Sequence, residues 1–139
     1  MKIGIVGSRT YPYLEIVKKY INTLPQDTTI ISGGAIGVDT EAKNSAKANN
    51  LEYIEFLPDK TIKGHYAQKY YERNKQIVNA SDMIVAFTEK ESGGTWNTIK
   101  YAKAKVIPII IISNEKSVIT ENLPKEQISK YKPYLYTIL

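Results

Sequence analysis

The sequence contains no cysteine and a single histidine, His65. The first absence excludes disulfide bonds, thiolate zinc sites and a cysteine nucleophile, and a lone histidine is more often incidental than catalytic. The longest apolar run, residues 106–112, has only the length of a strand and contains Pro108, so no membrane-spanning segment is expected. The N-terminus lacks the layout of a signal peptide, and we therefore expect a cytoplasmic protein.

Two common phosphate-binding motifs are also absent. The sequence has no G-x-G-x-x-G dinucleotide fingerprint and no G-x-x-x-x-G-K-[ST], which disfavours a P-loop NTPase. The composition is otherwise that of a globular domain, with 42% hydrophobic and 24% charged residues. The formal net charge is +5, but the lysines are scattered along the chain. This scatter favours a solvated surface over a DNA-binding track, and either would attract phosphate.

Strand-like and helical segments alternate along the first 112 residues. Strands are expected at 2–7, 28–32, 53–57, 83–87 and 106–112, and helices at 13–24, 38–49, 67–79 and around 96–102. Apolar strands that alternate with helices are typical of a parallel sheet covered on both faces. We therefore predict an α/β three-layer fold with a five-stranded, mainly parallel sheet. Residues 1–139 are expected to form one domain, with 113–139 a C-terminal extension packed on it or on a partner subunit.

Two glycine-rich turns, each between an expected strand and an expected helix, are the main candidates for a binding site. The first reads Ser32-Gly33-Gly34-Ala35-Ile36-Gly37-Val38-Asp39, and the second reads Glu91-Ser92-Gly93-Gly94-Thr95. The first N–H groups of a helix lack internal partners and lie at the positive end of its dipole, so such turns attract anions. In a parallel sheet, both turns and Gly7-Ser8-Arg9 meet beyond the carboxyl ends of the strands. The sequence therefore predicts a phosphate-bearing ligand at that edge.

The candidate ligand-binding residues come from these three segments and from the helix at 67–79. They are Gly7, Ser8, Arg9, Ser32, Gly33, Gly34, Gly37, Asp39, Asn74, Ser92, Gly93, Gly94 and Thr95. Serine and threonine supply hydroxyl donors, and the Arg9 guanidinium can hold a phosphate through two parallel hydrogen bonds. Asp39 either stabilises the dipole of its helix or accepts from a ribose hydroxyl, and these two roles are equally favoured. No metal site and no cofactor are expected.

The same residues, in this order, resemble the SLOG superfamily of Rossmann-like proteins. The resemblance spans about residues 1–112 and rests on Gly7-Ser8-Arg9, the motif from Ser32 to Ala42, Arg73-Asn74-x-x-Ile77, Ser81-Asp82 and Ser92-Gly93-Gly94-Thr95. The segment Lys63-Gly64-x-x-Ala67 favours the YspA/YpsA-like branch. Related branches are the Rossmann domain of DNA-processing protein A and the Lonely Guy phosphoribohydrolases. The resemblance implies a Rossmann-like fold and a nucleotide pocket, with the phosphate over the two Gly-Gly turns.

Three functions remain open. The first is a sensor, carrier or sequestering protein for a nucleotide-like small molecule such as AMP, NAD or an ADP-ribose derivative. The second is a phosphoribohydrolase that cleaves the N-glycosidic bond of nucleoside 5′-monophosphates, in which Arg73 matches the arginine of the Lonely Guy enzymes. Their catalytic acid is missing after the second turn, which disfavours hydrolysis, and Asp39 or Glu91 could replace it only with suitable geometry. The third is a protein that binds single-stranded DNA. We expect the first function, in a homodimer or higher homo-oligomer.

Overall fold

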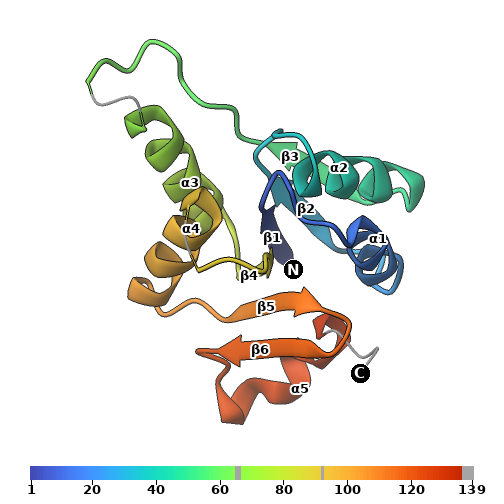
Figure 1. Cartoon of the computed structure of the whole chain (residues 1–139). Helices are drawn as coiled ribbons and strands as arrows, with labels where there is room; N and C mark the ends of the chain where they lie inside the picture. Colours follow the sequence, from blue (N-terminus) through green and yellow to red (C-terminus); the bar gives the residue numbers. More distant parts are fainter. Residues whose placement is uncertain (65–66, 92, 136–139) are drawn as a thin grey trace.

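Six strands form one sheet that has helices on both faces (Figure 1). The computed structural model describes residues 1–64, 67–91 and 93–135. The strands are β1 (Lys2–Gly7), β2 (Thr29–Ser32), β3 (Glu52–Glu55), β4 (Met83–Phe87), β5 (Ile109–Asn114) and β6 (Ser117–Glu121). The α-helices are α1 (Leu14–Asn22), α2 (Val38–Ala48), α3 (Gln68–Ala80), α4 (Gly93–Ala104) and the short α5 (Ile128–Tyr131), which lies between the 3-10 turns Lys125–Gln127 and Lys132–Tyr134.

The order of the strands places a crevice between β1 and β4. The order is β3-β2-β1-β4-β5-β6, and all neighbouring pairs are parallel except β5 and β6. The chain therefore moves outward from β1 to β3 and then returns to the other side of β1. Gly7 at the end of β1 pairs with Phe87 at the end of β4. Such a reversal of strand order is where open α/β sheets bind their ligands. The three-layer Rossmann-like architecture predicted from the sequence is confirmed.

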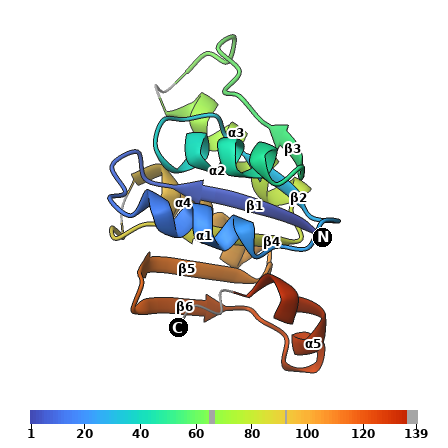
Figure 2. The same ribbon diagram turned by 90° about the vertical axis from the view of Figure 1, so that its right-hand side faces the viewer.

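Each face of the sheet has its own core because successive side chains of a strand point to opposite faces. Ile3 and Ile5 pack with residues of α1 and α2, whereas Val6 packs with residues of α3 and α4. The two helix pairs flank the sheet in both views (Figures 1 and 2). The loops that lead into α2 and α4 consequently flank the crevice from opposite faces of the sheet.

The sixth strand is a correction to the five strands expected from the sequence. β6 pairs antiparallel with β5 through the tight turn between Asn114 and Ser117. β6 lies at the edge of the sheet, none of its five residues is fully buried and Ile119 is exposed. Its sequence therefore lacks the continuous apolar run by which the other strands were predicted. β5 itself begins at Ile109 rather than at residue 106. Val106 has φ of 57°, outside the strand region, and Pro108 follows it.

Residues 122–135, which follow β6, fold back onto the domain. Tyr131 and Tyr134 are buried in the core that α1 and α2 form with the sheet. The hydroxyl group of Tyr20, on α1, donates a hydrogen bond of 2.7 Å to the carbonyl oxygen of Tyr134. In the described part of the chain, no helix has the length and apolar character needed to cross a membrane.

Candidate functional site

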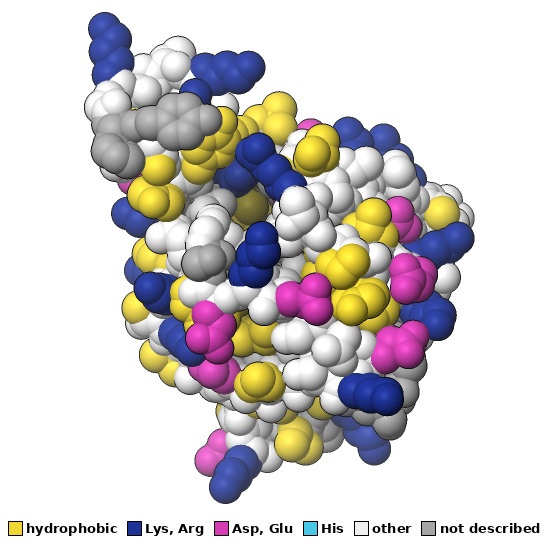
Figure 3. Space-filling model, viewed as in Figure 1, with side chains coloured by type: hydrophobic (Ala, Val, Ile, Leu, Met, Phe, Trp, Pro, Cys, Tyr) yellow, Lys and Arg dark blue, Asp and Glu magenta, His cyan; other side chains and the backbone are white. Residues whose placement is uncertain are grey.

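A cavity of ≈ 860 Å³ opens at the carboxyl ends of β1 and β4. Its volume lies in the range of roughly 300–1,000 Å³ that is usual for small-molecule sites. Lys and Arg side chains, drawn in blue, border the hollow in the middle of this face (Figure 3). The lining comes from the end of β1, the N-termini of α2 and α4, the loop before α4 and one side of α3. Segments that are far apart in the sequence therefore share one wall.

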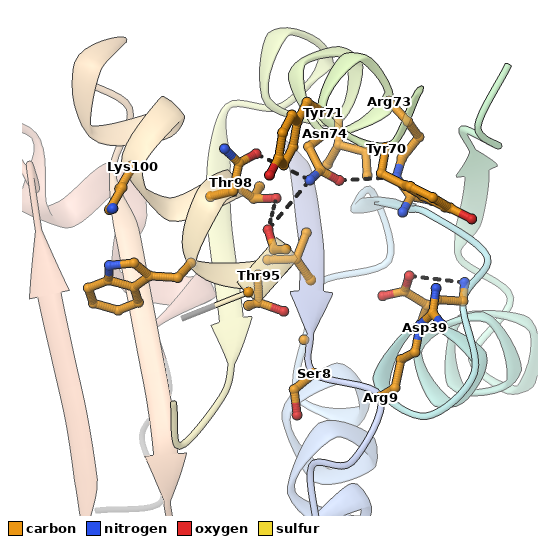
Figure 4. A pocket seen from close by; sticks show the side chains of 18 of the residues that line it. Ser8, Arg9, Asp39, Tyr70, Tyr71, Arg73, Asn74, Thr95, Thr98 and Lys100 are labelled. Atoms are coloured by element: carbon orange, nitrogen blue, oxygen red, sulfur yellow. Dashed lines mark hydrogen bonds between the residues drawn. The ribbon is translucent and has the colours of Figure 1, made fainter. Parts of the chain in front are cut away.

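Both arginines of the chain, Arg9 and Arg73, line this cavity. Arg9 follows β1, whereas Arg73 lies in the middle of α3 (Figure 4). Arg73 donates through Nη1 to the carbonyl oxygen of Gly33 (2.6 Å) and through Nε to Asn74 Oδ1 (3.1 Å). Partial burial lowers the pKa of Arg73, the negative charge of Asp39 opposes this, and the positive charge of Arg9 lowers it further. Two guanidinium groups within electrostatic reach of each other make this wall attractive to an anion.

The first glycine turn makes room for the two arginines. A Cβ atom on Gly33 would lie 2.6 Å from Arg73 Nη1, and one on Gly37 would lie 2.8 Å from the carbonyl oxygen of Arg9. Gly37 also has φ of 83°, which residues with a side chain rarely adopt. The turn thus lets its backbone approach the guanidinium group of Arg73 and the backbone of Arg9 closely.

Asp39 supplies an anion to the N-terminus of α2 from within the chain. Its Oδ2 accepts a hydrogen bond of 3.1 Å from the backbone N–H of Ala35. The side chain is buried, and burial raises the pKa of Asp39, while the bond from Ala35 and the charge of Arg73 lower it. The carboxylate therefore holds the position at the helix terminus where a bound anion would otherwise be stabilised.

The second glycine turn opens directly onto the cavity. Gly93, Gly94 and Thr95 begin α4 and belong to the lining (Figure 4 labels Thr95). The first N–H groups of α4 have no partner within the helix. Asn74, buried on α3, holds this terminus in place because its Nδ2 donates to the Gly94 carbonyl oxygen and to Asn97 Oδ1, with a distance of 3.4 Å in each case. The amide thus connects α3 to the start of α4.

The structure brings most of the sequence-predicted site residues together around this cavity. Those in the lining are Gly7, Ser8, Arg9, Asp39, Arg73, Asn74, Gly93, Gly94 and Thr95. Four others, Ser32, Gly33, Gly34 and Gly37, do not belong to the lining, and the buried Ser32 donates through Oγ to the carbonyl oxygen of Ile5 (2.8 Å). Ser92 and His65 fall outside the described residues.

Several lining residues were not among the sequence candidates. They include five aromatic and lysine side chains, Tyr70, Tyr71, Lys90, Trp96 and Lys100. The lysines on either side of the second glycine turn were a usable signal, whereas nothing in the sequence distinguished these aromatic residues from core residues. Asp39 and Glu91 are the carboxylates of the lining. Within residues 1–64, 67–91 and 93–135, no group of three His, Asp or Glu side chains is arranged to hold a metal ion.

Comparison with known proteins gives a family match and several similar structures. The family model described as DNA recombination-mediator protein A matches residues 1–68. The structure of DNA processing protein A from Streptococcus pneumoniae aligns with a TM-score of 0.70 and 21% identity, over 81% of this chain and 50% of that one. This chain therefore spans half the length of that protein. A search of curated proteins finds no match.

Two further structures share the fold. DNA processing protein A from Helicobacter pylori, whose structure is described for its single-stranded DNA binding mode, has a TM-score of 0.66 and 15% identity over 99% of this chain and 76% of that one. The structural-genomics target TM1055 has a TM-score of 0.58 and 18% identity over 78% and 71% of the two chains. The assignment to the YspA/YpsA-like branch stays a prediction. The strand order and these neighbours show a Rossmann-like fold, and the family match over residues 1–68 is in line with the SLOG superfamily that the motifs predicted.

Proposed function

We propose that the cavity binds a nucleotide and that it holds the phosphate between Arg9 and the N-terminus of α4. The observation that carries this proposal is that both arginines of the chain line one cavity, at the edge of the sheet where the strand order reverses between β1 and β4. Seventeen of the nineteen basic residues are lysines, so the placement of both guanidinium groups at one site is selective. Arginine is the side chain best suited to bidentate recognition of phosphate.

The two glycine turns have different roles in this proposal. The second turn receives the phosphate. Gly93, Gly94 and Thr95 line the cavity and form the N-terminus of α4, a helix of 12 residues. The first turn instead positions Arg73 and Asp39 at the wall. Arg73 and Asp39 then contact the sugar or the base, and the lining residue Tyr70 supplies an aromatic surface beside them. The protein acts as a sensor, carrier or sequestering protein for this nucleotide.

Single-stranded DNA is the second candidate ligand, favoured by the family match and the two DNA processing protein A structures. In that case the bound nucleotide is one unit of a longer strand. Lys90 and Lys100, both exposed at the lining, are placed to neutralise neighbouring phosphates. Homo-oligomers remain part of the proposal, and light scattering on the purified protein measures them.

Calorimetric titration of the protein with dAMP, AMP and a dA12 oligonucleotide tests the proposal. The affinity for the nucleotide should be at least about tenfold lower in Arg9→Ala than in the wild type, because one charge-assisted hydrogen bond is worth about 1.5–3 kcal/mol. Lys18→Ala is the matched control, since it removes one positive charge from the exposed face of α1 outside the lining. It should leave binding unchanged.

The outcomes separate the two ligands. Binding of mononucleotides that depends on Arg9 but not on Lys18 supports the nucleotide pocket. Binding of dA12 alone, with an affinity that falls steeply with salt, favours single-stranded DNA because counterions are released. If no nucleotide and no oligonucleotide binds at millimolar concentration, the proposed function is wrong.

A further inference from the structure

A second, smaller hollow adjoins the nucleotide cavity on the side of β5 and β6. It has a volume of ≈ 260 Å³, and Lys90, Glu91 and Trp96 line both hollows. The strand end and loop before α4 form one side, through Thr88 and Glu89. β6 forms the other side, through Ile119 and Glu121. The two hollows are therefore adjacent parts of one surface, and the residues they share form the boundary between them.

Trp96 at this boundary is held by contacts that leave it partly exposed. The Lys103 ammonium lies 5.4 Å from the centre of the Trp96 ring, a cation–π arrangement. Lys103 also forms an ion pair with Glu121, with 3.1 Å between Nζ and Oε2. The indole is thus connected through Lys103 to β6, and its orientation is restricted before any ligand arrives. A partly exposed, oriented aromatic ring beside a phosphate-attracting cavity is a surface on which a base can stack.

The charges of the two hollows differ in sign. The larger cavity has four basic residues in its lining, Arg9, Arg73, Lys90 and Lys100, against Asp39 and Glu91. The smaller one has three carboxylates, Glu89, Glu91 and Glu121, against Lys90 and Lys103. A phosphate is repelled from the smaller hollow, whereas a base with amino groups can donate hydrogen bonds to carboxylates there. The smaller hollow therefore suits an uncharged aromatic ring with donor groups.

We propose that Trp96 and the smaller hollow form a second subsite, which takes the amino-bearing base of a second nucleotide unit. The ligand class is then a molecule with two bases, either a free dinucleotide or two adjacent units of a nucleic acid strand. This inference rests on the proposed function, because the first unit occupies the larger cavity. Thr88 and Ser113 add hydroxyl groups to the lining, and Ile119 adds an apolar surface.

Titration with matched ligands tests the second subsite. The ligands are dAMP, the 5′-phosphorylated dinucleotides pdApdA and pdTpdT, and diadenosine 5′,5′-diphosphate. At least one of the two adenine-containing dinucleotides should bind tenfold or more tightly than dAMP, and pdTpdT should gain less because thymine has no amino group. Since Trp96 is the only tryptophan, its fluorescence should be quenched more by the tighter dinucleotide than by dAMP. A gain for pdApdA indicates a nucleic acid strand as the source, and a gain for the 5′,5′-linked ligand indicates a free dinucleotide.

Two substitutions make the test specific. Trp96→Ala should reduce the ratio of dinucleotide to dAMP affinity to about one, whereas Trp96→Phe should keep most of the gain because a ring remains. Circular dichroism establishes that both variants fold. If dAMP binds in an Arg9-dependent manner but no dinucleotide gains affinity, or if Trp96→Ala keeps the gain, the second subsite is refuted and the nucleotide pocket stands. If no nucleotide binds, the proposed function itself fails.

Discussion

The contact between Arg73 and Gly33 predicts a strong energetic coupling between α3 and the first glycine turn. Arg73 Nη1 lies 2.6 Å from the Gly33 carbonyl oxygen, and a Cβ on Gly33 would lie 2.6 Å from the same nitrogen. Arg73→Ala therefore removes a charge-assisted hydrogen bond across 40 residues of sequence. Gly33→Ala keeps both partners but forces the guanidinium group away. The two substitutions act on one contact and should not be additive.

The magnitudes follow from the geometry. A hydrogen bond to a charged group is worth about 1.5–3 kcal/mol, and the partial exposure of Arg73 places Arg73→Ala near the lower end of that range. Overpacking costs about 1–3 kcal/mol, so Gly33→Ala should destabilise by a similar amount. In the double variant the added methyl group no longer meets the guanidinium group. The double variant should therefore be about as stable as Arg73→Ala alone.

Urea unfolding of the four proteins, followed by circular dichroism and by the fluorescence of Trp96, measures the free energies of this cycle. The coupling should be at least about 1 kcal/mol, with unchanged slopes against urea. Arg73→Lys is the matched control, since it keeps the charge but loses the planar fork of donors, and its stability should fall between the wild type and Arg73→Ala. Additive effects of the two substitutions, or an Arg73→Ala protein as stable as the wild type, would refute the coupling.

Three further predictions concern Asp39, the tail and turnover. Burial raises the pKa of Asp39 from its ordinary value of 3.8, so the folded chain binds this proton more tightly than the unfolded chain and loses stability as pH rises through the folded pKa. The free energy of unfolding of Asp39→Asn should therefore gain on that of the wild type as pH rises above 3.8, and a pH-independent difference contradicts this. Tyr20→Phe should lower the free energy of unfolding in urea by about 1–2 kcal/mol, because it leaves the Tyr134 carbonyl oxygen without its buried donor. A change below about 0.5 kcal/mol, the scale of neutral surface substitutions, contradicts this. If the site hydrolyses AMP, chromatography will detect adenine, and its release will stop in Arg73→Ala; release that continues in that variant excludes Arg73 as the catalytic arginine.

The sheet was predictable from the sequence because its central strands are buried on both faces. β1 and β4 are almost wholly buried, and such strands read as continuous apolar runs between helical segments. β6 escaped the prediction because it lies at the edge and exposes Ile119. An edge strand is specified by its partner β5 and by the two-residue turn before it, and neither produces a clear apolar pattern.

The position of the candidate cavity was predictable, but the roles that we propose for the residues around it were not. Glycines between a strand and a helix indicate the edge of the sheet where ligands bind, and this inference does not depend on which side chains surround them. Whether the N–H groups of a turn are available depends on nearby side chains, and Asp39 folds back onto Ala35 by a rotamer that the sequence does not specify. For the same reason Trp96 could not be told from a core residue until α4 and β6 were placed together.

The position of Tyr131 and Tyr134 in the core has a consequence for biosynthesis. These side chains pack against the layer formed by α1, α2 and the first strand, and Tyr134 accepts the hydrogen bond from Tyr20. During translation the N-terminal elements emerge first, at about 5–20 residues per second. The layer around α1 therefore lacks two of its aromatic side chains until residue 134 has left the ribosomal tunnel. The nascent chain therefore completes its native packing on that face only after residue 134 has emerged.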